Sequence, residues 1–191
     1  EGIDLHTRTA NLIWGSDITP DQRQLAKQTN FASLYGAGAK KLAESAGISF
    51  NQARHIFDQF WNSYPELRYY CETKLKKDIV LNGYVKTLYG RRIHLAENEH
   101  YKGINYVIQG TCAEVSKISM YNVWKHLQST GGSIRNIVHD SILIDGVAES
   151  SVPMIKEIME DFVESPNGNF KVPITVDIKR SSKSWGDMSD E

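Results

Sequence analysis

Four side chains of complementary chemistry stand four residues apart near the start of the chain. Arg23 and Lys27 are cations, and Phe31 and Tyr35 are aromatics. On a helix this spacing places all four on one gently winding face. The two cations repel one another unless an anion lies between them, and a polyphosphate suits both a guanidinium fork and an ammonium. The aromatics offer flat surfaces for a base and a sugar. The spacing also fits a solvated basic end followed by two core aromatics.

A single carboxylate, Asp140, follows His139 between two apolar runs, IRNIV and ILI, that are typical of short strands. A carboxylate held by strands at a hairpin tip is a good Mg²⁺ ligand. His139 beside it suits a phosphate or the backbone of a nucleic acid. Asp is also a common turn residue, so this pattern leaves the metal role open.

Two amides and two arginines could contact a nucleic acid. Asn105 and Gln109 are four residues apart in a predicted helix, so both can donate to base acceptors in a minor groove. Arg91 and Arg92 follow a predicted tight turn and suit backbone phosphates. The alternatives are a polar helix face and two solvated arginines.

Caps, breakers and hydrophobic periodicity predict the elements that position these residues. Thr19 with Gln22 and Ser49 with Gln52 form capping boxes, each at the start of a helix. We expect helices over about 20–35, 40–46, 49–63, 66–81, 101–129 and 152–162. We expect a hairpin around Tyr89-Gly90, two short strands meeting at His139-Asp140, and a half-buried strand over 172–178.

These elements predict an α+β fold, with a nearly all-helical first half and a second half that mixes helices with a small antiparallel sheet. The 191 residues are 40 % hydrophobic and 24 % charged, which excludes a disordered chain. No run approaches the roughly 18 apolar residues of a membrane-spanning helix, and we expect no membrane partner. Cys71 and Cys112 are expected to be reduced, buried thiols of a cytosolic protein. The net charge of −1 does not by itself indicate nucleic-acid binding, although it hides any local basic groove.

Taken together and in order, the motifs resemble those of family A DNA polymerases, the family of bacterial DNA polymerase I. The motifs are NFASLYG at 30–36, TLYGRR at 87–92, INYVIQGT at 104–111 and VHD at 138–140. The resemblance covers essentially the whole chain. It implies a mostly helical fingers subdomain over 1–98 and the distal part of a palm subdomain over 99–191.

The resemblance implies template-dependent addition of deoxynucleotides to a primer 3′-OH by two-metal phosphoryl transfer, in DNA replication or repair. Arg23 and Lys27 would hold the incoming triphosphate, and Lys27 could protonate the leaving pyrophosphate. Phe31 would pack on the sugar and base, and Tyr35 would stack at the template. The other implied contacts are Asn105 and Gln109 in the minor groove, Arg91 and Arg92 on DNA, His139 at the primer terminus, and Asp140 on catalytic Mg²⁺. A bacterial or phage-infected cell is implied, with the protein in the cytoplasm.

The sequence departs from the family pattern at three points. Tyr101 stands where the family usually has Arg, which puts one primer contact in doubt. Ser141 stands where the family usually has Glu, and His-Asp-Ser also resembles single-subunit phage RNA polymerases, so RNA synthesis stays an alternative. The Asp-Tyr-Ser-type motif that carries the family's other metal-binding Asp does not occur in these residues.

The third departure affects activity most. Two-metal chemistry needs carboxylates on both sides of the ion pair. We therefore expect a second polypeptide, or an N-terminal region, to supply the other Asp and the thumb, and we expect the isolated chain to be inactive. A non-catalytic nucleic-acid-binding remnant is the remaining alternative.

Overall fold

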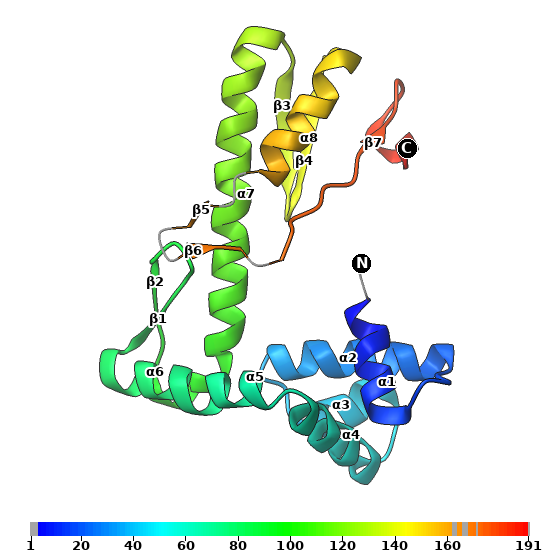
Figure 1. Cartoon of the computed structure of the whole chain (residues 1–191), viewed down its shortest axis with the longest axis vertical. Helices are drawn as coiled ribbons and strands as arrows, with labels where there is room; N and C mark the ends of the chain where they lie inside the picture. The colour runs from blue at the N-terminus through cyan, green and yellow to red at the C-terminus, as the bar shows by residue number, and fades with distance from the viewer. Residues whose placement is uncertain (1–3, 162–163, 166–167, 171, 191) are drawn as a thin grey trace. The chain divides into compact units, whose positions relative to one another are not determined.

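The computed structural model describes residues 4–161, 164–165, 168–170 and 172–190. They form two compact units, one of residues 1–87 with 92–108 and one of residues 88–91 with 109–191 (Figure 1). A long helix, α7 (Gly103–Thr130), contributes residues to both units. Helices dominate the first unit and antiparallel strand pairs occur in both, so the predicted α+β class is confirmed. The division into fingers over 1–98 and palm over 99–191 stays a prediction.

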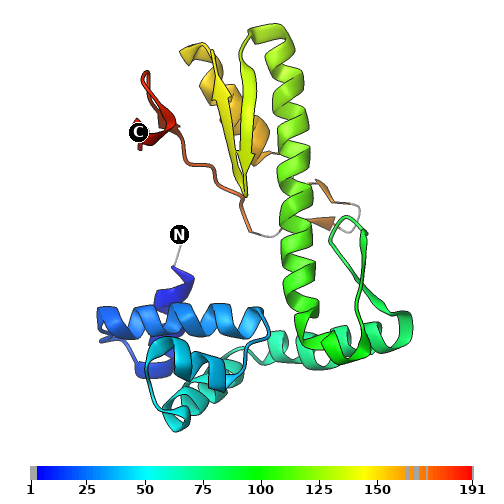
Figure 2. The ribbon, with the colours of Figure 1, turned by 180° about the vertical axis from the view of Figure 1, so that it is seen from behind.

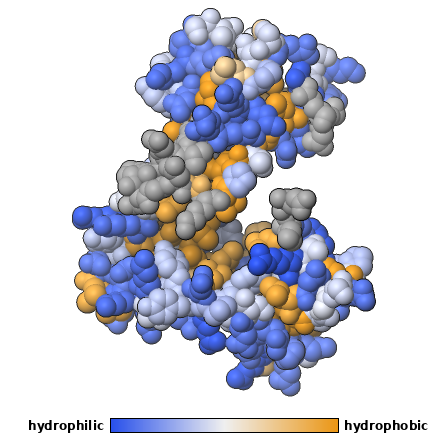
Figure 3. All heavy atoms as spheres, viewed as in Figure 1, coloured by the Kyte–Doolittle hydropathy of each residue, from blue (hydrophilic) through white to orange (hydrophobic). Residues whose placement is uncertain are grey.

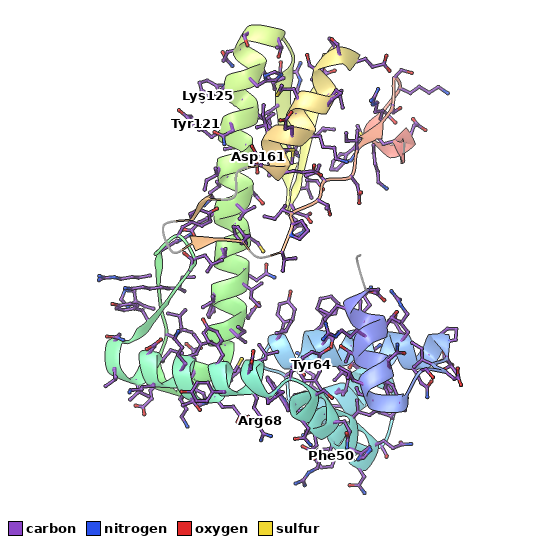
Figure 4. The ribbon with its side chains drawn as sticks, viewed as in Figure 1. Phe50, Tyr64, Arg68, Tyr121, Lys125 and Asp161 are labelled. Carbon is purple, nitrogen blue, oxygen red and sulfur yellow. The ribbon has the colours of Figure 1, made fainter. Side chains whose placement is uncertain are left out.

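Four helices begin the first unit: α1 (Leu5–Trp14), α2 (Pro20–Leu34), α3 (Ala39–Ala46) and α4 (Phe50–Ser63). Both predicted capping boxes are present, Thr19 with Gln22 at α2 and Ser49 with Gln52 at α4. Leu42 of α3 and Ala53 and Ile56 of α4 form the buried centre of this group. The Tyr64 hydroxyl, labelled in Figure 4, is 2.9 Å from the Thr9 hydroxyl and ties the end of α4 to α1.

The helix predicted over 66–81 has three parts. They are α5 (Pro65–Tyr69), a π-helical segment η1 (Tyr70–Leu75) and α6 (Lys76–Asn82). The predicted hairpin follows, with β1 (Tyr84–Lys86) antiparallel to β2 (Arg92–His94). A 3-10 helix, η2 (Glu97–Lys102), leads into α7, so the long helix begins two residues later than predicted. The second core of this unit consists of Leu75, Ile79, Val85, Leu95 and Ile104.

The second unit is built around a hairpin that packs on helices. β3 (Ser133–Val138) runs antiparallel to β4 (Ser141–Asp145), and the strands meet at His139-Asp140 as predicted. A short 3-10 helix, η3 (Glu149–Ser151), precedes α8 (Val152–Glu160). Val123 and Leu127 of α7 and Ile155 of α8 are the buried centre. Figure 1 shows α8 in front of the β3–β4 hairpin and Figure 2 shows it behind the hairpin, with α7 alongside in both views.

The predicted strand over 172–178 is wrong, because residues 173–178 form no strand. Its alternation holds over 174–178, since Ile174, Val176 and Ile178 are half-buried and the residues between them are exposed. Val172, at the start of the predicted strand, is exposed. The backbone N–H of Val176 donates to the Glu160 carboxylate at 2.7 Å, rather than to a neighbouring strand. Alternation predicts which side chains face a core, but it does not supply a hydrogen-bonding partner.

The remaining described pairs are short: β5 (Glu164–Ser165) with β6 (Gly168–Asn169), and β7 (Lys179–Arg180) with β8 (Ser189–Asp190). A 3-10 turn, η4 (Trp185–Asp187), lies between β7 and β8. Phe162, expected at the end of the last helix, lies outside the described residues. The expectation of two buried thiols is wrong for Cys112, which is exposed on α7, while Cys71 is half-buried.

The surface is mainly hydrophilic on the face shown in Figure 3, with apolar side chains gathered along α7. Tyr121 and Lys125 project from one side of α7, with the ammonium 5.4 Å from the ring centre (Figure 4). In the part of the chain that the structure describes, no helix has the length and apolar character needed to cross a membrane.

Candidate functional site

The row of cations and aromatics lies on α2 and its C-terminal cap. Arg23, Lys27 and Phe31 are on the helix, and Tyr35 is the capping residue. Phe31 is 44 % exposed and Tyr35 is 46 % exposed, and their ring centres are 6.1 Å apart. Because both rings reach the surface of this unit, the structure argues against the alternative in which they are core residues. Lys27 is half-buried and Arg23 is exposed.

Arg23 is held by a residue that no motif in the sequence indicates. Its Nη2 lies 2.8 Å and its Nε 2.9 Å from Oδ2 of Asp4, the N-cap of α1. The Thr7 hydroxyl donates to the same carboxylate oxygen at 2.6 Å. The Thr7 hydrogen bond, supported by Arg23, holds the pKa of the Asp4 carboxyl well below its usual range. Asp is a common N-cap, but no sequence spacing indicates that this one also reaches α2.

His6 is a second neighbour that the sequence did not reveal. Its ring centre is 5.7 Å from that of Phe31, and its Nδ1 is 3.0 Å from the buried amide nitrogen of Asn30. Asn30 therefore fixes the imidazole beside the aromatic part of the row. A nitrogen heterocycle, two aromatic rings and two cations line one side of α2, which is a set suited to a phosphorylated, ring-bearing ligand.

The second group lies at the tip of the β3–β4 hairpin. His139 and Asp140 form the two-residue loop, and both are exposed. His139 has φ of 56°, the left-handed conformation that two-residue hairpin loops favour. Asp140 is thereby placed between the ends of two paired strands, as the sequence predicts.

The fit of Asp140 to a metal centre is incomplete. The described residues include no group of three or more His, Cys, Asp or Glu side chains that could hold a metal ion. Mg²⁺ prefers six oxygen ligands and commonly takes one or two carboxylates with waters and substrate phosphates. Asp140 could serve as one such ligand, but by itself it does not form a two-ion site.

The TLYGRR turn is fixed to the QGT part of α7. The backbone N–H of Leu88 donates to the hydroxyl of Thr111 at 3.1 Å, and Thr111 is 6 % exposed. Thr111 was not among the predicted functional residues, and its hydroxyl positions the turn that carries Arg91. Arg91 is exposed on this turn.

Arg92 lies on β2, where its guanidinium carbon is 4.9 Å from the ring centre of Tyr84 across the hairpin. This stacking spreads the side chain over the strand pair and leaves it exposed. On α7, Asn105 is half-buried and Gln109 is exposed, one turn apart as predicted. The role of these two amides in a minor groove stays a prediction.

The predicted residues form separate groups. The α2 row, Arg92 and Asn105 belong to the first unit, whereas Arg91, Gln109, His139 and Asp140 belong to the second. The structure brings together Arg23, Lys27, Phe31 and Tyr35 through one helix, and His139 with Asp140 through one loop. Their roles in binding or catalysis stay predictions.

Comparisons with a family model and with known proteins all give DNA polymerases. The sequence model of DNA polymerase family A matches residues 1–187. The chain is 32 % identical over 177 residues to the thermostable DNA polymerase I of Thermus filiformis, covering 84 % of this chain and 21 % of the relative. It is also 32 % identical over 190 residues to the DNA polymerase of Mycobacterium phage D29, covering 98 % of this chain and 30 % of the relative.

A solved structure is similar to the chain in fold. It is the POL domain of Pol1 from M. smegmatis in complex with DNA primer-template and dNTP. The TM-score is 0.75 at 25 % identity, covering 89 % of this chain and 32 % of the solved one. The chain thus spans between about a fifth and a third of the length of these relatives.

Proposed function

Because this chain belongs to DNA polymerase family A, we propose that it forms part of a DNA-directed DNA polymerase that adds deoxynucleotides to a primer 3′-OH. The observation that carries the proposal is the row on α2 and its cap, where two cations precede two aromatics along one helix face. Both aromatics and Arg23 are exposed, and Lys27 is half-buried. Cations followed by aromatics match the phosphates, sugar and base of a nucleotide.

In this proposal, the α2 row binds the incoming nucleotide. Arg23 and Lys27 contact the triphosphate, because a guanidinium fork and an ammonium together neutralise a polyanion. Lys27 also donates a proton to the leaving pyrophosphate. Phe31 packs on the sugar and base, and Tyr35, at the end of the helix, stacks at the template position.

The DNA contacts that we propose come from polar side chains on other elements, of which all but the half-buried Asn105 are exposed. Asn105 and Gln109 donate to minor-groove acceptors, which are similar for all base pairs and therefore suit an enzyme that must accept any sequence. Arg91 and Arg92 contact backbone phosphates, and His139 approaches the primer terminus.

Asp140 is the proposed Mg²⁺ ligand, and a second carboxylate is required. We propose that this carboxylate, with the thumb, comes from an N-terminal region or from a second polypeptide. In the same proposal residues 1–98 are the fingers and residues 99–191 are the distal part of the palm. The isolated 191-residue chain is then expected to be inactive.

Primer extension tests the proposal. The purified chain is assayed on a primer-template with dNTPs and Mg²⁺, alone and with a polypeptide that supplies the Asp-Tyr-Ser-type motif and the thumb. We expect extension only in the mixture, and loss of it with Asp140→Ala. Asp145→Ala is the matched control, because Asp145 lies on the same hairpin but pairs with Arg135 at 3.3 Å. Extension by the chain alone would refute the need for a partner.

A second candidate function is RNA synthesis, favoured by Ser141 directly after Asp140. The same assay with ribonucleotides in place of deoxynucleotides distinguishes the two. Preference for ribonucleotides in the complete mixture would favour the RNA-synthesising alternative. Retained binding of primer-template without extension of either kind would favour a non-catalytic nucleic-acid-binding role.

A further inference from the structure

Asp4 makes an unusual number of hydrogen bonds for an exposed carboxylate. Its Oδ2 accepts from the backbone N–H of Thr7 at 3.0 Å, from the Thr7 hydroxyl at 2.6 Å and from Nε and Nη2 of Arg23 at 2.9 and 2.8 Å. Its Oδ1 accepts from the backbone N–H of His6 at 3.4 Å. One side chain therefore caps α1 and also holds a cation of α2.

The contact uses one particular edge of the Arg23 guanidinium. A guanidinium has five N–H donors and two edges that bind an anion through two bonds: Nε with Nη2, and Nη1 with Nη2. Asp4 occupies the first edge, and the Thr7 hydroxyl oxygen lies 3.2 Å from the same Nε. Among the described residues, Nη1 has no hydrogen-bonding partner. The second edge is thus available to a ligand.

We propose that Asp4 is a positioning residue that orients Arg23 so that its Nη1–Nη2 edge meets the triphosphate of the incoming nucleotide. This inference rests on the proposed nucleotide-binding role of α2. Asp4 does not compete with the phosphate, because the carboxylate and the phosphate use different edges. The residue acts through Arg23 and does not itself touch the nucleotide.

The exposure and the rotamer freedom of the Arg23 side chain explain why a residue that orients it favours ligand binding. Arg23 is 46 % exposed, and a long exposed side chain has many rotamers whose loss must be offset when it binds an anion. A carboxylate fixed by the first turn of α1 restricts the guanidinium before the ligand arrives, which lowers the entropic cost of binding. The negative charge of Asp4 acts in the opposite direction, since it repels a phosphate.

Two neutral variants separate orientation from charge. Asp4→Asn keeps both the N-cap and an oxygen that accepts from Arg23, whereas Asp4→Ser keeps the N-cap but is too short to reach the guanidinium. Both remove the same charge. Each is made in the full chain, alone and together with Arg23→Ala, and binding of dATP and of inorganic tripolyphosphate is measured by calorimetry or NMR titration. Circular dichroism checks that every variant is folded.

The positioning role predicts that Asp4→Asn binds both ligands about threefold more tightly than Asp4→Ser, which is the size of one exposed hydrogen bond. This difference in binding between Asp4→Asn and Asp4→Ser should vanish when each is combined with Arg23→Ala. A general effect of the two substitutions on the fold would persist in the combined variants. Equal binding by the two variants, or a difference that persists without Arg23, overturns this inference alone. If Arg23→Ala does not weaken binding by the wild-type chain, the proposed function of α2 fails as well.

Discussion

Gly36 and Tyr101 approach so closely that a Cβ on Gly36 would lie 2.6 Å from the carbonyl oxygen of Tyr101. Gly36 has φ of 70° and follows the cap of α2, while Tyr101 lies in η2, just before α7. Within the first unit, this contact fixes the end of the α2 row against a segment that is 65 residues later in the chain. The position at which the family usually has Arg thus has a packing role in this protein.

The first prediction concerns this contact. Gly36→Ala should lower the free energy of unfolding by more than Gly47→Ala, because Gly47 has a similar φ of 66° but open space where a Cβ would lie. The left-handed conformation alone costs a non-glycine residue about 1–2 kcal/mol, and the clash at Gly36 should add about 1–3 kcal/mol. Urea unfolding measures both. Equal losses would contradict a tight contact with Tyr101.

The second prediction concerns the hairpin tip. His139 has φ of 56°, so His139→Gly should unfold at a higher urea concentration than His139→Ala, by about 1 kcal/mol in free energy. Both variants lack the imidazole, and both should weaken primer-template binding equally if the ring contacts DNA. Similar stability of the two variants would mean that the loop relaxes to another conformation.

The third prediction concerns Lys27. When the chain is mixed with the polypeptide that supplies the Asp-Tyr-Ser-type motif and the thumb, Lys27→Ala should reduce the rate of nucleotide addition by about 10²-fold. This is the loss expected for a cation that stabilises developing charge. Binding of the duplex should change little, because the proposed DNA contacts lie elsewhere. Lys40→Ala is the control, since Lys40 is exposed on the neighbouring α3. Parallel loss of duplex binding and rate would contradict the assignment of Lys27 to the nucleotide.

The fourth prediction concerns pH. The pKa of the Asp4 carboxyl is lower in the folded chain than in the unfolded one, chiefly because the Thr7 hydroxyl donates to the ionised form. Its contribution to stability is therefore present above the unfolded value of about 3.9 and is lost as the pH falls through the folded value. The difference in urea midpoint between wild type and Asp4→Asn should shrink below about pH 4.

A control for this pH scan is Asp58→Asn. Asp58 is exposed and lies 4.0 Å from Arg54, so its substitution should have a small effect at every pH. A difference in urea midpoint between wild type and Asp4→Asn that stays constant from about pH 7 to about pH 3 would contradict this prediction. It would show that Thr7 and Arg23 do not stabilise the ionised form of the Asp4 carboxyl.

Local signals in the sequence predicted most of the longer helices, because their causes lie within a few residues, but they did not predict α1 (Leu5–Trp14). The capping boxes of Thr19 and Ser49 each span four positions, and both are present as expected. The α2 row followed from spacing alone, since helix geometry fixes which side chains share a face. The exposure of Phe31 and Tyr35 was left open, because burial depends on what packs against the helix.

The parts that could not be predicted depend on contacts between distant segments. Asp4 reaches Arg23 across 19 positions, and Leu88 reaches Thr111 across 23. The alternation correctly indicated which side chains are half-buried over 174–178 but not at Val172, which is exposed. Val176 bonds to Glu160 instead of to a strand. A side-chain acceptor of this kind leaves no periodic signal in the sequence.

The π-helical segment η1 has a consequence for changes in chain length. Each residue of an α-helix advances its side chain by about 100°, and a π-helical turn accommodates an extra residue within an otherwise continuous helix. Deleting one residue between Tyr70 and Leu75 would therefore restore regular winding, and Leu75 and Ile79 could stay buried without any rotation of α5. The wide turn absorbs the extra residue, so the helices before and after it keep the faces that they present to their neighbours.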